Sequence, residues 1–204
     1  MPDPRPARIA RVTYALTILA FVALLAWGGL HSSLEQFDGK AMGARLLLFP
    51  LAGALVPAIW LLGLRAARGA GRGLPTFPWA AATLATLPFV IDLVGNTFSM
   101  YIEIEHFDDL VHTINPILGV AAVALLLDRT SAPRWSVWTM AFGLGCAAHI
   151  GFELFEYALL VGFGAKELGL TLLDTLSDLG YGMIGAAIGA CASLVTRVDR
   201  RPVG

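Results

Sequence analysis

The sequence contains little charge and little cysteine. Only 14% of its 204 residues are Asp, Glu, Lys or Arg, whereas 57% are apolar and the mean hydropathy is +0.72. A soluble domain has about 25% charged residues, so this composition excludes an ordinary soluble enzyme. Both cysteines, Cys146 and Cys191, lie inside apolar runs. They do not indicate the disulfide framework of a small secreted protein.

Six apolar runs are long enough to cross the hydrocarbon core of a bilayer, which requires about 20 helical residues. We predict an all-α, polytopic membrane bundle of six transmembrane helices, with residues 1–204 forming a single transmembrane domain. The connecting loops leave no room for a separate catalytic, sensor or nucleic-acid-binding domain, so we expect no nucleic-acid partner. The predicted spans lie near residues 12–30, 45–64, 79–97, 107–127, 135–162 and 172–195.

Basic residues are distributed unevenly between alternate connecting segments. With the N-terminus in the cytoplasm, eleven arginines lie on the cytoplasmic side and only Lys40, Arg45 and Lys166 lie on the other. The positive-inside rule therefore predicts that both termini are cytoplasmic. The first apolar run is longer than the roughly 7–15 residues of a signal peptide, so we expect it to be an uncleaved first helix.

Four predicted spans contain polar side chains that are rare inside membranes. In the six-span topology, the late part of an outward-running helix and the early part of an inward-running helix lie at the same depth. We therefore expect these side chains to converge in the outer half of the bilayer. They are Asp92 and Asn96 in the third span, Asp108, Asp109, His112 and Asn115 in the fourth, His149, Glu153 and Glu156 in the fifth, and Asp174, Asp178 and Tyr181 in the sixth.

The spacing of these residues places each set on one face of its helix. An acidic residue at the membrane centre costs about 2.5–3.5 kcal/mol on insertion scales, so these faces must point into the bundle. No Lys or Arg lies among them in the sequence. We therefore expect the carboxylates to stay protonated, to hold a cation or to line a wet cavity.

A mixture of carboxylates and imidazoles favours Zn, Mn or Fe, whereas a site made only of oxygen ligands would favour Mg or Ca. We expect a divalent transition metal, as one ion or two, with Glu153 and Asp178 as the catalytic acid or base. The predicted ligands are Asp108, His112, Glu153, Glu156, Asp174 and Asp178, and the predicted supporting residues around them are Asp92, Asn96, Asp109, His149 and Tyr181.

Small residues recur at four-residue spacing in the last two spans. They are Gly143, Ala147 and Gly151 in the fifth span, and Gly185 and Gly189 in the sixth. Such spacing lets helices approach closely in lipid. We expect these residues to bring the fifth and sixth spans together.

The second half of the chain resembles the YjdF-like family of bacterial inner-membrane proteins, which is distantly similar to VanZ-like proteins. The matching segments are Gly95–Asn96, Tyr101, "FDDLVH" at 107–112, "ELFEY" at 153–157 and "DTLSD" at 174–178. The chain differs from the family pattern at Thr113, where an aromatic residue is usual, and at Leu170 and Thr171, where an acidic residue is common. The resemblance implies a multi-pass protein of the bacterial inner membrane and implies no reaction.

These observations lead to three alternative functions. The first is a membrane enzyme whose metal site acts on a lipid or lipid-linked substrate that enters from the outer leaflet, with membrane lipids as its other partners. The second is a proton- or cation-coupled transporter that uses the same carboxylates. The third is an accessory membrane protein in which the polar cluster links helices by hydrogen bonds.

Overall fold

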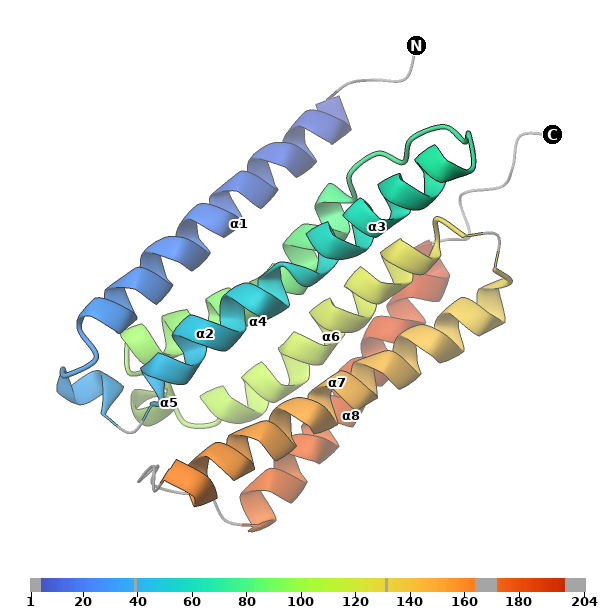
Figure 1. Cartoon of the computed structure of the whole chain (residues 1–204). Helices are drawn as coiled ribbons and strands as arrows, with labels where there is room; N and C mark the ends of the chain where they lie inside the picture. The colour runs from blue at the N-terminus through green and yellow to red at the C-terminus, as the bar shows by residue number, and fades with distance from the viewer. Residues whose placement is uncertain (1–4, 39, 131, 164–171, 197–204) are drawn as a thin grey trace.

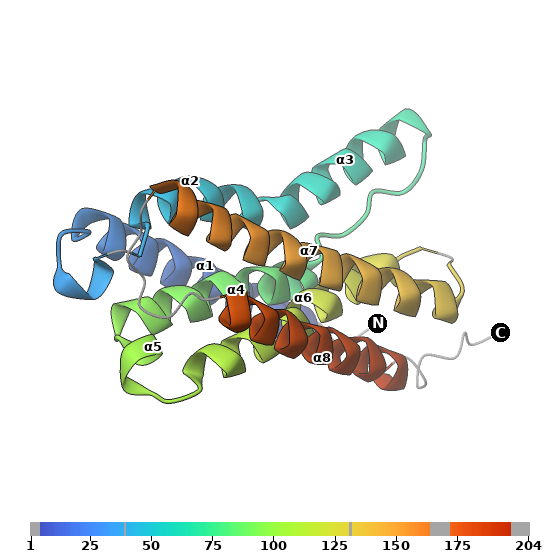
Figure 2. The same ribbon diagram turned by 90° about the horizontal axis from the view of Figure 1, so that it is seen from below.

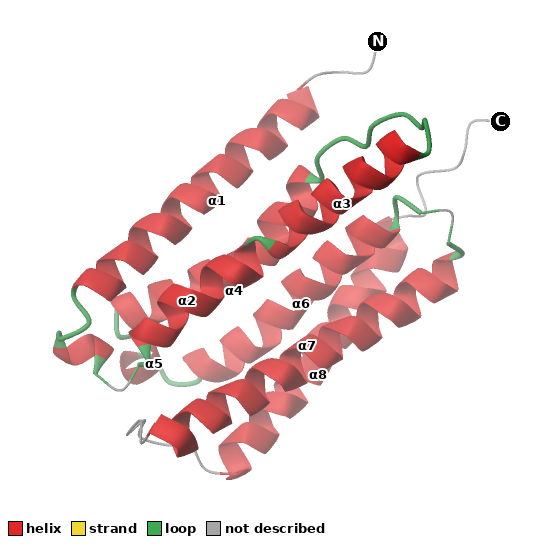
Figure 3. Cartoon of the chain, viewed as in Figure 1, coloured by secondary structure: helices red, strands yellow, loops and turns green. Residues whose placement is uncertain are grey.

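The computed structural model describes residues 5–38, 40–130, 132–163 and 172–196, and all regular elements in these ranges are helical (Figures 1 and 3). This confirms the predicted all-α class. In chain order the elements are α1 (Arg5–Leu30), the 3₁₀ helix η1 (Glu35–Phe37), α2 (Met42–Gly53), α3 (Leu55–Gly69), α4 (Trp79–Thr97), α5 (Met100–Glu103), α6 (Phe107–Leu127), α7 (Arg134–Phe163) and α8 (Leu172–Thr196).

Five segments of the described chain are long and apolar enough to cross a membrane. They are α1, residues Met42–Gly69 (which join α2 and α3), α4, α6 and residues Arg134–Phe155 of α7. The predicted spans 79–97 and 107–127 have the same bounds as α4 and α6. The sixth predicted span corresponds to α8, which packs against α6 and α7 (Figure 2). The six-span topology itself stays a prediction.

The predicted second span, 45–64, is interrupted in the structure. Helix α2 ends at Gly53 and α3 begins at Leu55, with Ala54 in a turn between them. Pro57 has no amide hydrogen to donate to the carbonyl of Gly53, four residues earlier, and its ring crowds that carbonyl. The proline therefore accounts for the break in the helical hydrogen bonds at this point.

Two apolar cores hold the helices together, and α4 joins them by packing against α6. The first core links α1, η1, α2 and α4. The second links α6, α7 and α8. The buried residues of the first are Phe21, Leu25, Phe37, Met42, Phe49 and Leu93, and those of the second are Val120, Ala124, Val137, Ala141, Ala186 and Ala190.

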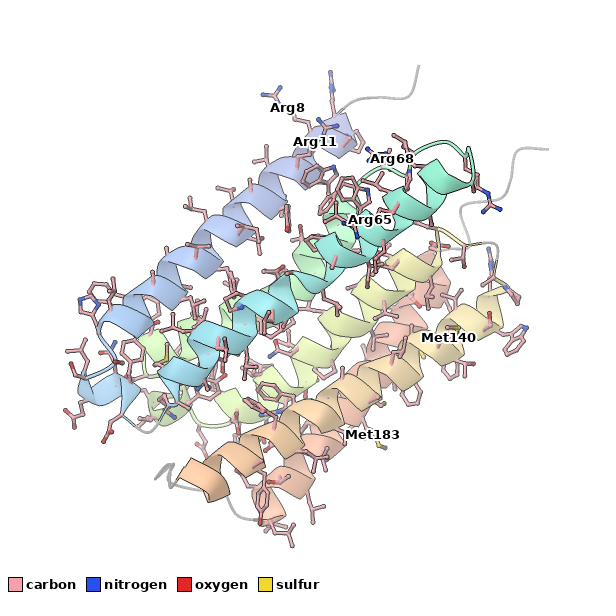
Figure 4. All side chains as sticks on the ribbon, viewed as in Figure 1. Arg8, Arg11, Arg65, Arg68, Met140 and Met183 are labelled. Atoms are coloured by element: carbon pink, nitrogen blue, oxygen red, sulfur yellow. The ribbon has the colours of Figure 1, made fainter. Side chains whose placement is uncertain are left out.

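Large apolar side chains also cover the outside of the bundle. On α1, Leu16 and Leu19 are more than 60% exposed, and Met140 of α7 and Met183 of α8 project from the surface (Figure 4). Apolar patches of this extent are unfavourable in water, whereas the hydrocarbon core of a bilayer solvates them. The exposed surface therefore agrees with the membrane location that the composition predicts.

Arginine side chains gather at one end of the bundle. Arg8 and Arg11 of α1 lie at the same end as Arg65 and Arg68 of α3 (Figure 4). The start of α1 and the end of α8 lie at this end as well (Figure 1). The opposite end contains α5 and the start of α6, and we refer to it as the acidic end.

Glycines of α8 permit its close contact with α6. A Cβ atom at Gly185 would collide with the backbone carbonyl of Thr113, and one at Gly189 would lie 2.8 Å from the carbonyl oxygen of Ile117. The sequence pattern predicts that these glycines contact the fifth span. In the structure they set the distance between α8 and α6 instead.

The small-residue stripe of α7 faces away from the bundle, so the prediction that it packs against the sixth span is wrong. A Cβ atom at Gly143 or Gly151 would have no neighbour within 4 Å, and Ala147 is exposed. The buried face of α7 follows a different four-residue series: Val137, Ala141, Gly145, His149 and Glu153. His149 and Glu153, the polar residues of this series, must not face lipid. This requirement determines which side of α7 faces the interior of the bundle.

We expect Gly185→Ala to destabilise the protein and Gly143→Ala to leave its stability unchanged or slightly higher. Alanine gains roughly 0.5–1 kcal/mol over glycine in a helix, but overpacking at Gly185 costs about 1–3 kcal/mol. Thermal unfolding of both variants in detergent measures the difference. An equal melting temperature for the two variants would contradict the close contact between α6 and α8.

Candidate functional site

The acidic end of the bundle is shaped by a tight connection between α4 and α6. Ser99 and His106 adopt left-handed backbone conformations, with φ of 55° and 61°, on either side of the short helix α5. The second of these residues is the N-cap of α6. The turn therefore places Asp108 and Asp109, in the first turn of α6, at the acidic end of the bundle.

The two acidic residues of this first turn have different partners. Asp109 Oδ2 lies 2.9 Å from Nδ1 of His106, on the exposed rim. Asp108 Oδ1 lies 3.2 Å from Nε2 of His112, one turn further into α6. Asp108 therefore belongs to the interior cluster, whereas Asp109, which the sequence predicts as a supporting residue of the site, pairs with His106 at the rim.

His112 connects α6 to α7. Its imidazole is buried, and its Nδ1 lies 2.9 Å from Oε1 of Glu153. Glu153 is only 2% exposed. Although His112 is so close, Glu153 Oε1 accepts no hydrogen bond of normal geometry. An isolated buried carboxylate is costly, so this oxygen needs either a hydrogen-bond donor or a positive charge beside it.

His149 adds a second imidazole to the cluster. Its ring centroid lies 5.5 Å from that of His112, and its Nε2 lies 3.8 Å from Glu153 Oε1. His149 Nε2 donates to the backbone carbonyl of Asp178 at 2.9 Å. This bond holds the Nε2 hydrogen, so only Nδ1 of His149 has a lone pair for a metal ion; a ring N–H donated to a carbonyl is the usual way of orienting such an imidazole.

Gly182 of α8 makes room for this imidazole. A Cβ atom at position 182 would collide with the ring of His149. The sequence predicts His149 as a supporting residue, and the structure places it beside the predicted ligands. Helical spacing places His149 on the same face as Glu153, but the contact with Gly182 of α8 is not visible from one helix.

Two overlapping groups of three residues bring donor atoms close enough together that each group could hold a metal ion. One group consists of His112, His149 and Glu153, and a second consists of Asp108, His112 and Asp178. Within each group the potential ligand atoms all lie within 4.8 Å of one another. His112 belongs to both groups. We call these five residues the His-acid cluster.

The remaining predicted site residues of α7 and α8 lie outside this convergence. Asp174 is half-buried, one turn before Asp178, and Tyr181 is 36% exposed. Asp174 belongs to neither group of converging donors found among the described residues. The side chain of Glu156 lies outside the described part of the chain, so its predicted ligand role stays a prediction.

Asp92 and Asn96 form a different arrangement, and this corrects the expectation that no cation accompanies the predicted polar set. Arg45 Nε donates to Asp92 Oδ2 at 3.0 Å, and Arg45 Nη2 donates to Asp92 Oδ1 at 3.3 Å. Arg45 Nη1 also donates to the carbonyl of Lys40. An arginine at the edge of an apolar run needs a partner, and this signal could have predicted an acidic partner for Arg45. The topology prediction uses Arg45 only as a charge of the connecting loop.

Several further contacts fix the carboxylate of Asp92. Asn96 Nδ2 donates to the backbone carbonyl of Asp92 at 2.8 Å and to its Oδ1 at 3.2 Å. Tyr101 donates its hydroxyl hydrogen to the same Oδ1 at 3.4 Å. The Lys40 ammonium lies 5.8 Å from the centre of the Tyr101 ring. These contacts form an ion-pair network that ties α2 to α4 and α5.

Comparison with known proteins identifies one family. Residues 13–200, nearly the whole chain, match the family described as "Predicted membrane protein (DUF2238)". No curated protein and no solved structure matches the chain.

We expect Asp92→Ala to destabilise the protein by about 3–5 kcal/mol, because it leaves the charge of Arg45 buried without its carboxylate. The double substitution Arg45→Gln with Asp92→Asn should cost much less, since it removes both charges and keeps hydrogen-bonding groups. Thermal unfolding in detergent, with the exposed Asp38→Ala as control, measures both. Equal stability of Asp92→Ala and the control would contradict a structural ion pair.

Proposed function

We propose a function from the premise that the chain belongs to the YjdF-like family of predicted membrane proteins, DUF2238. In this proposal the protein is a six-span protein of the bacterial inner membrane, with both termini in the cytoplasm and the acidic end facing outward. It is a metal-dependent membrane enzyme whose substrate is a lipid or lipid-linked molecule. The convergence of donor atoms in the His-acid cluster carries this proposal.

The proposed topology is supported by charge and helix packing. The arginine-rich end of the bundle would face the cytoplasm, as the positive-inside rule requires. Helix α8 would be the sixth span, because it is 25 residues long and packs along α6 and α7.

Cysteine labelling tests this topology. After replacement of Cys146 and Cys191, we expect Glu103→Cys to react with a membrane-impermeant maleimide on spheroplasts and Ala70→Cys to react only after the cells are lysed. Both positions are exposed, at opposite ends of the bundle. Reaction at position 70 before lysis would contradict the proposed orientation.

The His-acid cluster supports a transition-metal site by its donor types. Two imidazoles and three carboxylates are ligands that suit Zn, Mn or Fe. A divalent ion held there would supply Lewis-acid activation of a water molecule or of a substrate oxygen. Glu153 and Asp178 would then be positioned to accept or donate a proton, and Asp108, whose side chain is 44% exposed, would face the incoming substrate.

A small apolar cleft beside the cluster, with a volume of about 30 Å³, marks the proposed point of lateral entry for a lipid. It runs between α2 and α7 and is lined by Ala41, Ala44, Arg45, Leu48, Phe49, Phe152 and Phe155. The ring centroid of Phe152 lies 6.5 Å from that of His112. The cleft is therefore separated from the His-acid cluster by about one side chain.

The packing below the cluster favours an enzyme over a transporter. A transported ion needs polar groups along a path through the protein. Beyond His149, toward the arginine-rich end, the buried hydrophobic core of α6, α7 and α8 consists of valine and alanine side chains, with the buried polar atoms Asn115 Oδ1 and Trp138 Nε1 beside it. A polar cluster above a mainly apolar core suits chemistry at one side of the membrane.

Elemental analysis of purified protein tests the metal site. We expect close to stoichiometric transition metal in the wild type. His112→Asn and Glu153→Gln each remove a proposed ligand, so we expect each to lower the affinity for the metal about tenfold or more. Glu105→Gln, an exposed acidic residue at the same end, is the matched control, and size-exclusion chromatography monitors folding.

Absence of metal from the wild type, even after the addition of Zn, Mn or Fe, would contradict the proposal. In that case His112 would act as an imidazolium paired with Asp108 and Glu153. The cluster would then link α6 to α7 as a structural ion pair, as in the accessory-protein alternative.

A further inference from the structure

The arginine-rich end of the bundle carries positive charge without matching carboxylates. Arg8 and Arg11 lie one helical turn apart on α1, and Arg65 and Arg68 lie one turn apart on α3 (Figure 4). All four residues are exposed. In the part of the chain that the structure describes, no carboxylate forms an ion pair with any of them. We call these four residues the arginine patch.

A bound anion would remove the repulsion within each arginine pair. Residues three apart on a helix are neighbours on one face, and like charges at this spacing destabilise the helix. A guanidinium group has five N–H donors in a planar fork that matches phosphate oxygens. Each pair of arginines is therefore suited to one phosphate group, and the two helices together are suited to two.

Aromatic rings join the two helices that carry the arginine patch. The ring centroid of Phe77, in the segment before α4, lies 5.6 Å from that of Tyr14 of α1 and 5.2 Å from that of Trp60 of α3. Trp79 of α4 extends this set, because its ring centroid lies 4.4 Å from that of Phe77. The guanidinium carbon of Arg11 lies 5.9 Å from the centre of the Trp79 ring. Tryptophan and tyrosine side chains favour the level of the lipid head groups, so the rings place the patch at that level.

Hydrogen bonds fix the segment between α3 and α4 in place. Trp60 Nε1 donates to the carbonyl of Pro75 at 3.0 Å, and Arg129 Nη1 donates to the carbonyl of Thr76 at 2.5 Å. Together with the ring contacts, these bonds hold the ends of α1 and α3 in a set arrangement. A ligand that contacts both helices would therefore meet a preorganised surface, which lowers the entropic cost of binding.

We infer that the arginine patch binds a phospholipid that bears two phosphate groups, with one phosphate at the arginine pair of each helix and the hydrocarbon chains in the bilayer beside the aromatic rings. Basic side chains at the end of a membrane helix attract anionic head groups. This inference goes beyond the proposed enzyme, because the patch and the His-acid cluster lie at opposite ends of the bundle.

Lipid titration followed by native mass spectrometry, on the detergent-purified full chain, tests this inference. Tetraoleoyl cardiolipin has two phosphodiester groups, dioleoyl phosphatidylglycerol has one, and dioleoyl phosphatidylcholine has one phosphodiester that its own choline neutralises. We expect the wild type to bind cardiolipin about tenfold or more tightly than phosphatidylglycerol, and phosphatidylcholine most weakly, in line with charge-assisted hydrogen bonds.

Two double variants remove one arginine pair each. Arg8→Gln with Arg11→Gln, and Arg65→Gln with Arg68→Gln, should each weaken cardiolipin binding about tenfold or more and leave phosphatidylcholine binding unchanged. If a glutamine variant does not fold, Arg65→Lys with Arg68→Lys keeps the charge and should still bind cardiolipin several-fold more weakly than the wild type, because an ammonium group lacks the planar fork.

A charge-matched control separates a site from general attraction to the arginine-rich end. Arg72→Gln with Arg134→Gln also removes two exposed arginines but leaves the patch intact, so it should bind cardiolipin as the wild type does. Size-exclusion chromatography monitors folding, and the maleimide labelling monitors orientation.

Three results overturn the inference. They are equal loss of cardiolipin binding in the control and the patch variants, equal affinity of the wild type for cardiolipin and phosphatidylglycerol, and displacement of cardiolipin by inorganic pyrophosphate at the same concentration. The last would show a site for soluble phosphate compounds. None of these results depends on whether the His-acid cluster holds a metal ion.

Discussion

The low polarity of the bilayer is the constraint on which the rest of this structure depends. Buried acidic and imidazole groups have no access to bulk water there, so each must face another polar group inside the bundle. The buried series on α7 that ends in His149 and Glu153 follows this requirement. The close contact at Gly182 follows from it as well, because α8 must approach near enough to cover an imidazole.

The two polar assemblies of the protein meet this constraint in different ways. Asp92 is compensated by Arg45, and the pair fastens α2 to α4 with no ligand required. In the His-acid cluster three carboxylates face two imidazoles, so protein groups supply at most two compensating charges. This imbalance is the physical reason for proposing a bound cation there, and it distinguishes the cluster from the ion-pair network beside it.

Much of the helical architecture could be predicted from the sequence, because a run of about 20 apolar residues forms a helix in a bilayer whatever surrounds it. Helical spacing also grouped Asp108 with His112 and His149 with Glu153 correctly, since it depends only on one helix. Interactions between helices could not be predicted in this way. The Arg45–Asp92 pair joins residues 47 positions apart, and the inward face of α7 depends on which neighbours it meets.

X-ray absorption spectroscopy of the zinc-loaded protein tests the central claim most directly, because it reports the atoms around a bound ion. The arrangement of His112 and His149 beside Glu153 predicts a spectrum with imidazole scattering, and nitrogen or oxygen neighbours at about 2.0–2.2 Å. Loss of one imidazole contribution in a His149→Asn variant would assign the signal to this cluster. A zinc spectrum with only oxygen neighbours, unchanged in that variant, would contradict the account.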